Sequence, residues 1–273
     1  MKNVYLFVFL IFLSCESNES SSQDETHPNS PSKTVKKIHF VENGFDSNIP
    51  YIYEGNISFS YLPSSTNISN IKYDIKLTQN GVVSNSDLIY NFSYSNNKLD
   101  NVTFGNSSMK FNYSNSILTS IDYYNIKGWS GKNAKFELNY NSDNRLEKIK
   151  CIHPYYTTEN NLLYANNKLS KVTIIKDNQI YQNINLSYDD KFNSFKNISK
   201  ELKIFFSLID GYGYMFPYDE YNWLTSFWDE NNVINYNENT FEYSYEDNYV
   251  KNAKVSFKYN STQNNTTIFE YTY

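Results

Sequence analysis

The feature that most constrains this chain is a strict alternation of apolar and polar residues in short segments that end in tyrosine. The segment Tyr90-Asn-Phe92-Ser-Tyr94 is typical. Successive side chains of a β-strand point to opposite faces, so this pattern places the apolar residues on one face of a sheet and the polar residues on the other. A two-faced antiparallel sheet is expected, because buried parallel strands are apolar throughout. The same alternation recurs at 109–113, 136–140, 184–188, 241–245, 255–259 and 269–273.

The alternating segments are joined by a recurring phrase. Tyr94 is followed by a polar turn and then by Leu99 and Val102, an aliphatic pair three residues apart. The turns at 95–98, 142–145 and 165–168 are rich in Asn and Asp, which tolerate the left-handed backbone of tight hairpins. Because the spacing between successive tyrosines varies, we predict a meander of unequal hairpins rather than a solenoid.

Length and composition fit one large all-β domain. The chain has 273 residues, of which 18% are aromatic and 19% are charged, with a formal net charge of −5. A chain this long can bury a real core. The mild acidity and the lack of a basic stripe give no reason to expect nucleic acid as a partner.

The N-terminus predicts a lipoprotein. Residues 1–14 have a short basic start and an apolar run from Val4 to Leu13, which is too short to span a bilayer and is typical of a signal peptide. The run ends in Phe12-Leu13-Ser14-Cys15, which resembles a bacterial lipobox and implies cleavage before Cys15 and acylation of that residue. The alternative is an ordinary signal peptide with an incidental cysteine. Residues 15–34 contain Ser, Glu and Pro and almost no apolar residue, so we expect a flexible tether before a domain at 35–273.

One region interrupts the alternation. Residues 199–210 carry apolar side chains at helical spacing, with Ser199 as a cap and Gly211 as a stop, and predict a short amphipathic helix on the aromatic face of the sheet. The connection at 211–230 is crowded with aromatic residues. Exposed Tyr and Trp suit sugar rings or protein partners, whereas buried rings would close the end of the core. The candidate ligand-binding residues are Tyr212, Tyr214, Tyr218, Tyr221, Trp223 and Trp228.

The tyrosine-ended hairpins resemble YD-type repeats. From Tyr188-Asp189 through the predicted helix to Phe241-Glu-Tyr-Ser-Tyr245 and the Tyr-rich C-terminus, the chain is similar to a family of uncharacterised lipoproteins of Bacteroidetes. This resemblance covers about residues 35–273. It implies an envelope location and a repeat fold, and it brings no catalytic residue or cofactor.

Candidates for chemistry are sparse. Cys151 and His153 are expected on one face of a strand, but a zinc site needs three or four ligands and a nucleophilic pair needs an orienting partner. His39 is expected to be an exposed strand residue. Acidic pairs at 189–190 and 246–247 are interpreted as turn residues rather than as glycosidase carboxylates. No metal or cofactor is predicted.

These observations predict a mainly β protein: one large, twisted antiparallel meander, curled or half-barrel-like, with a short helix on its aromatic face. The expected function is that of an outer-membrane lipoprotein, facing the periplasm or the surface, that binds a glycan, a protein or another envelope component without catalysis. A carrier of lipid or lipoprotein that uses the concave apolar face is the first alternative, and a hydrolase is the second.

Overall fold

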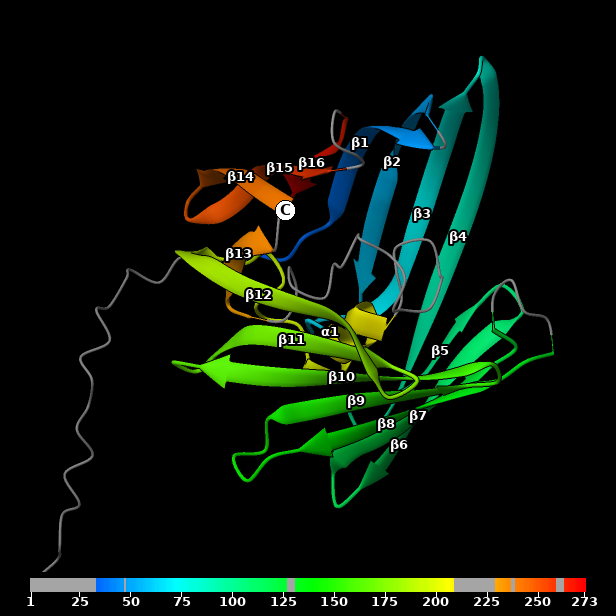
Figure 1. Ribbon diagram of the computed structural model, residues 1–273, viewed down its shortest axis with the longest axis vertical. Helices are drawn as coiled ribbons and strands as arrows, with labels where there is room; N and C mark the ends of the chain where they lie inside the picture. The colour runs from blue at the N-terminus through cyan, green and yellow to red at the C-terminus, as the bar shows by residue number, and fades with distance from the viewer. Residues whose placement is uncertain (1–32, 47, 127–130, 209–228, 237–238, 259–262) are drawn as a thin grey trace, which may run out of the picture. The chain divides into compact units, whose positions relative to one another are not determined.

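A computed structural model describes residues 33–46, 48–126, 131–208, 229–236, 239–258 and 263–273. Within them, the strands meander in sequence order around a closed barrel, each antiparallel to the strands before and after it, and one helix follows β12 (Figure 1). The strands are β1 (Lys37–Asp46), β2 (Ile49–Tyr61), β3 (Ile68–Gln79), β4 (Val82–Ser95), β5 (Lys98–Phe104), β6 (Ser107–Ser114), β7 (Ile117–Tyr124), β8 (Ala134–Tyr140), β9 (Leu146–His153), β10 (Tyr156–Ala165), β11 (Lys168–Lys176), β12 (Gln179–Phe192), β13 (Asn231–Tyr236), β14 (Asn239–Glu246), β15 (Tyr249–Lys258) and β16 (Asn264–Thr272), and the helix is α1 (Lys200–Leu208).

The predicted antiparallel meander is confirmed, but the predicted open, half-barrel form is wrong. β1 pairs with β16 from Lys37↔Thr272 to Asn43↔Thr266, so the first and last strands close the sheet. Both strands alternate like the others, and an open sheet would leave their hydrogen-bonding groups as free edges. Closure removes those two edges, and it depends on a pairing between the two ends of the chain that no local pattern specifies.

The inner face of the barrel is the hydrophobic core. On β3, for example, Ile71, Tyr73 and Ile75 are buried while the residues between them face outward. The helix lies in this core, as predicted, because Leu202, Ile204 and Phe205 are fully buried. The Phe205 ring meets the rings of Tyr90 and Phe92, with centroids 5.7 Å and 5.1 Å away. Apolar side chains therefore form a continuous buried cluster around α1.

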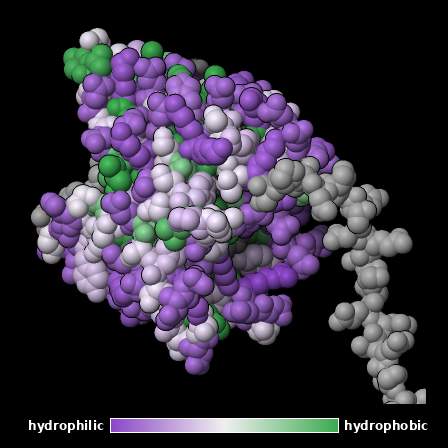
Figure 2. Space-filling view, turned by 180° about the vertical axis from the view of Figure 1, so that it is seen from behind, coloured by the Kyte–Doolittle hydropathy of each residue, from purple (hydrophilic) through white to green (hydrophobic). Residues whose placement is uncertain are grey.

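The outer face carries the charges. Lysines and carboxylates of neighbouring strands form ion pairs there, such as Lys76 with Glu54 at 2.7 Å and Lys110 with Asp100 at 2.6 Å. Hydrophilic residues cover most of the face seen in Figure 2. This barrel is therefore apolar inside and charged outside, whereas a transmembrane barrel presents an apolar band to lipid. No helix among the described residues has the length and hydropathy needed to cross a membrane.

The recurring phrase has a simple structural explanation. Asn96 and Asn97 take the left-handed backbone, with φ of 51° and 62°, as predicted for the turn. Next to the turn, the register between β4 and β5 shifts by one residue, because Tyr94 pairs with Leu99 and Ser93 with Asn101. The extra residue is a β-bulge. In a regular strand, every second side chain points inward, and the extra residue lengthens one such interval to three residues. Both Leu99 and Val102 therefore point into the core. The same shift recurs beside Tyr61, Tyr113, Tyr140, Tyr164 and Tyr245.

Each of these tyrosine-ended hairpin segments also forms a hydrogen bond with the segment before it. The hydroxyl of Tyr113 donates to the carbonyl of Leu99 at 2.7 Å, and that leucine belongs to the preceding hairpin. We name this set the tyrosine belt, and its O–H···O=C bonds are Tyr61 to Val35, Tyr94 to Ile68, Tyr113 to Leu99, Tyr164 to Leu146, Tyr188 to Leu169, Tyr243 to Val233 and Tyr273 to Val250. In each case a tyrosine near the end of an even-numbered strand bonds a residue at or near the start of the preceding strand. The repeat is therefore scaffold.

Candidate functional site

The aromatic site predicted from the sequence lies outside the described residues. Tyr212, Tyr214, Tyr218, Tyr221, Trp223 and Trp228 all belong to 209–228, and Cys15 belongs to 1–32. Their roles stay predictions. The described residues contain a different candidate, at the point where the chain enters the barrel.

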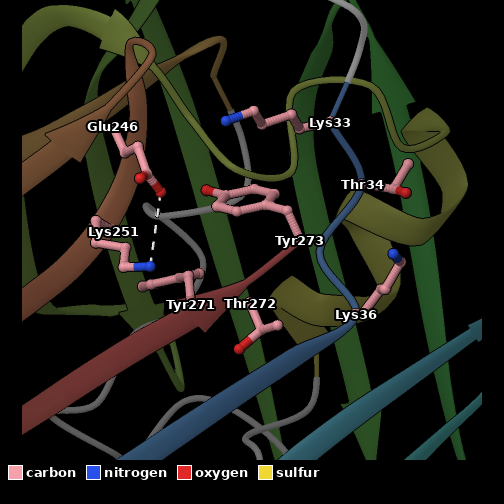
Figure 3. Close-up of a pocket in the computed structure, with 8 residues that line it drawn as sticks. All are labelled: Lys33, Thr34, Lys36, Glu246, Lys251, Tyr271, Thr272 and Tyr273. Atoms are coloured by element: carbon pink, nitrogen blue, oxygen red, sulfur yellow. Dashed lines mark ion pairs between the residues drawn. The ribbon is translucent and has the colours of Figure 1, made fainter.

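This candidate is a pocket of about 530 Å³ at the seam between the first and last strands (Figure 3). We call it the seam pocket, and its lining residues are Lys33, Thr34, Lys36, Glu246, Lys251, Tyr271, Thr272 and Tyr273. Backbone pairing fixes its shape, because the Lys36 N–H donates to the Thr272 carbonyl at 2.8 Å. The start of the described chain therefore meets the C-terminal strands here, and no local signal could have brought these two ends together.

The seam pocket is polar and rich in ammonium groups. Lys33 Nζ lies 2.8 Å from Asp247 Oδ2, and Lys251 Nζ lies 3.6 Å from Glu246 Oε2. The hydrogen bond with Asp247 is the main cause that raises the pKa of Lys33. Lys33 also lies over the Tyr273 ring, 5.7 Å from its centroid. An aromatic face beside hydroxyls and cations suits a polar or anionic ligand such as a sugar or a carboxylate.

Tyr273 is held rigidly at this pocket. Its hydroxyl donates to the Val250 carbonyl at 2.7 Å and lies 2.6 Å from Ser194 Oγ. Burial raises the pKa of Tyr273 to about 12, so the phenol is neutral at physiological pH. The ring is therefore a fixed surface rather than an acid or a base.

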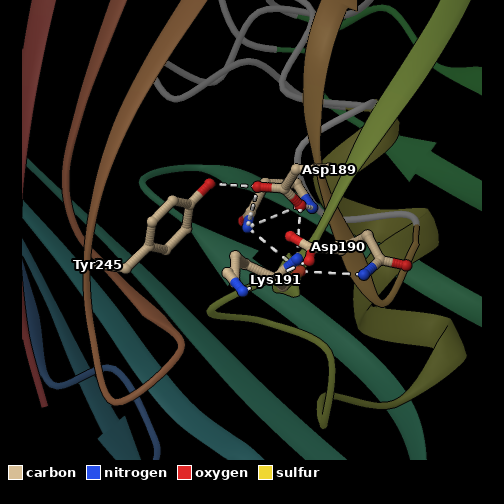
Figure 4. A network of polar contacts seen from close by, with 6 residues as sticks. Asp189, Asp190, Lys191 and Tyr245 are labelled. Carbon is tan, nitrogen blue, oxygen red and sulfur yellow. Dashed lines mark hydrogen bonds and ion pairs between the residues drawn. The ribbon is translucent and has the colours of Figure 1, made fainter.

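A second polar cluster surrounds Asp189 (Figure 4). This carboxylate accepts hydrogen bonds from the Lys191 N–H at 3.1 Å, from the Asn232 N–H at 3.0 Å and from the Tyr245 hydroxyl. Burial, and then the bond with Asp189, raises the pKa of Tyr245. Asp189 therefore joins β12 to β13 and β14.

The interpretation of Asp189 and Asp190 as turn residues is wrong. β12 continues to Phe192, which pairs with Asn231 and, in parallel, with Tyr249. Register shifts beside Tyr188 let the strand bend without ending. The other acidic pair fits better, since Asp247 and Asn248 form the β14–β15 turn with φ of 52° and 65°.

Cys151 and His153 lie on one face of β9, as predicted, and both point inward and are buried. Burial raises the pKa of the Cys151 thiol to about 12, so the thiolate needed for nucleophilic attack is not formed at neutral pH. Burial lowers the pKa of His153, whose ring stacks on Tyr156 at 4.2 Å. Among the described residues, no three or more His, Cys, Asp or Glu side chains are placed to hold a metal ion. His39 is exposed on β1, as predicted.

Comparison with known proteins bears on the fold alone. No family model matches the sequence, and no curated protein matches it. Among solved structures, the chain is similar to a porin-like protein from Bacteroides uniformis ATCC 8492, with a TM-score of 0.56 and 12% sequence identity over 89% of this chain and 97% of that chain. The barrel architecture is thus one that a crystallised bacterial protein also adopts.

Proposed function

We propose that this chain is a lipid-tethered protein of the bacterial envelope whose barrel faces water and binds a partner without catalysis. The polarity of the barrel wall carries the proposal. A charged residue on the lipid face of a transmembrane barrel costs about 2–4 kcal/mol at the bilayer midplane. Ion pairs such as Lys72–Asp74, Lys148–Glu159 and Lys254–Glu242 occupy the outward face of this barrel. Such a wall belongs in water, so another part of the chain must provide any membrane attachment.

The predicted acyl chains on Cys15 provide that attachment. Multiple acyl chains anchor a protein stably, whereas one chain holds only marginally. The tether at 15–34 then joins the barrel at Lys33, beside the seam pocket. The fold neighbour, a porin-like protein, supports an envelope location of this kind.

A polar ligand is favoured over a lipid. The seam pocket offers Lys36, Lys251 and Tyr273 to a sugar or an anionic group of an envelope component. The carrier alternative would require open space in the apolar interior, and α1 and its ring contacts occupy part of that interior. The hydrolase alternative finds less support, because Asp189 is fully engaged as a structural acceptor and the Cys151 thiol is neutral.

Membrane fractionation of Cys15→Ala tests the anchor. We expect the variant to leave the membrane pellet for the soluble fraction without detergent, because the outer face of the barrel carries ion pairs that are costly to place in lipid. Cys151→Ala removes the other cysteine, which is buried, and should stay in the pellet. Retention of Cys15→Ala in the pellet after a high-salt wash would refute the anchor.

Pull-downs from envelope extract test the binding site. Lys36→Ala/Lys251→Ala should lose the bound component, because the pocket loses two of its three ammonium groups. Trp223→Ala/Trp228→Ala serves as the comparison for the aromatic region predicted from the sequence. If the double tryptophan variant remains folded and loses the bound component, while the double lysine variant keeps it, the seam pocket is not the binding site.

A further inference from the structure

One long strand edge has no pairing strand among the described residues. β4 pairs with β3 along its length, from Gln79↔Val82 to Asn70↔Asn91. On its other side, β5 pairs only with Asn91–Ser95. Among the described residues, no strand pairs with residues 82–89 on that side, and the β3–β4 hairpin extends beyond its neighbours (Figure 1). We call residues 82–89 the free edge.

The turn identifies which backbone groups are unpaired. Asn80 and Gly81 have φ of 53° and 73° and form a two-residue turn, so the pair Gln79–Val82 that closes it exchanges both hydrogen bonds. Bonded pairs alternate along an antiparallel ladder. The even-numbered residues of β4 therefore bond to β3, and the N–H and C=O groups of Val83, Asn85, Asp87 and Ile89 point away from it. The same parity continues to Asn91, which pairs with β5.

The free edge lacks the usual protection of edge strands. Proteins guard such edges with lysine, proline, bulges or short length. Residues 82–89 contain no lysine or proline, their register with β3 has no shift, and Asp87 is their only charge. Val82 is 68% exposed, Val83 52% and Ile89 40%. Apolar side chains stand out at the tip of this hairpin in Figure 2, at the upper left.

We propose that the free edge pairs with the free edge of a second copy of this chain, antiparallel and centred on Ser86. The two copies are related by a two-fold axis normal to the sheet, so that their outer faces lie on the same side. Residues that face each other must then both be odd-numbered or both be even-numbered. In a pairing centred on Ser86, the numbers of two facing residues add up to 172, which meets this condition. Val83 then faces Ile89 of the second copy, and Asn85 faces Asp87. The backbone N–H and C=O groups of all four residues point away from β3, so each such pair can exchange two hydrogen bonds.

The side chains of this register complement one another. Exposed aliphatic groups meet in the Val83–Ile89 pairs, and a carboxamide that can donate meets a carboxylate in the Asn85–Asp87 pairs. No like charges lie opposite each other. The only pair formed by identical residues is Ser86–Ser86, whose small side chains fit at the axis. This pairing concerns the barrel alone and does not depend on the anchor or the seam pocket.

Disulfide trapping in the full chain tests the register. In the proposed pairing, Ser86 faces Ser86 of the second copy in a non-hydrogen-bonded pair, whose Cα atoms are about 4.5 Å apart. A disulfide can span this separation. Ser86→Cys should therefore give a covalent dimer on non-reducing gels after mild oxidation. Ser84→Cys is the matched control, because Ser84 is also exposed and lies on the same strand face, but it faces Leu88 of the second copy. It should give no covalent dimer on the same gels.

A proline variant tests the pairing without a crosslink. Asn85→Pro removes a donor that points to the free edge and leaves the bonds to β3 intact, so the barrel should fold while its mass by light scattering falls from dimer to monomer. The proposal is overturned if the wild-type protein is monomeric, if both cysteine variants crosslink equally, or if Ser86→Cys crosslinks to a different protein.

Discussion

In this barrel, tyrosine side chains link neighbouring strands through hydrogen bonds from their hydroxyl groups. Each residue of the tyrosine belt buries its ring at the rim of the core and uses its hydroxyl to bond the backbone of the preceding strand. A cation from a neighbouring turn lies over several of these rings, such as Lys98 over Tyr113 at 5.2 Å and Lys168 over Tyr188 at 5.6 Å. The ring supplies buried apolar area, and the hydroxyl bond fixes the position of one strand relative to the next. Phenylalanine lacks this hydroxyl, which explains why the repeat ends in tyrosine.

Tyr113→Phe tests this role. The change keeps the ring but removes the donor to the Leu99 carbonyl, so we expect a loss of about 1 kcal/mol in the free energy of unfolding, measured with denaturant. Tyr124→Phe is the matched control, because Tyr124 is 45% exposed and lies outside the belt. Its effect should stay within about 0.5 kcal/mol. Equal losses for both variants would argue against the belt.

The belt also predicts sensitivity to alkaline pH. Burial raises the pKa of Tyr61 and Tyr273, two members of the belt, to about 12, while the unfolded chain titrates near 10. Above pH 10 the unfolded state therefore binds fewer protons than the folded state, and stability falls as pH rises. Denaturant titrations at pH 8, 10 and 11, with phenolate absorbance as a second probe, should show full stability at pH 8 and a progressive loss above pH 10. A flat profile would contradict this prediction.

At the scale of the element, the hairpin with its bulge is the unit of construction. The alternation predicted the strands and their buried face, and the Asn-rich turns were predicted correctly. The three-residue spacing of the aliphatic pair also indicates the bulge, because inward-facing residues of an uninterrupted strand are two residues apart. The bulge could therefore have been inferred from Leu99 and Val102. The continuation of β12 through Asp189 could not, because it depends on Asn232 and Tyr245, which lie far along the chain.

Asn97→Val tests the turn. Asn97 has a φ of 62°, and a side chain that is branched at Cβ should cost about 1–2 kcal/mol there because it clashes with the backbone. Asn97→Gly relieves that clash and should be close to neutral. Urea unfolding of both variants gives the comparison, and equal stability of the Val and Gly variants would show that the turn backbone is not constrained.

At the scale of the whole molecule, closure and polarity decide what the barrel can do. Closure joins β1 to β16, more than 200 residues apart, and the seam pocket forms only because of it. Neither could be predicted from the sequence, because local patterns specify neighbours along the chain and not partners across it. Polarity could be predicted, since each alternating strand already separates apolar from charged residues. The charged face lies outward because the apolar face encloses α1.

Detergent-free folding of residues 32–273 tests whether this barrel faces water around an apolar core rather than spanning a bilayer. Those residues form one compact unit and lack the predicted leader and most of the tether. We predict that they stay in solution without detergent, show a β-rich circular dichroism spectrum and unfold cooperatively on heating. Folding that requires detergent or lipid vesicles, with insertion into the bilayer and ion conductance, would show instead that the barrel spans a membrane.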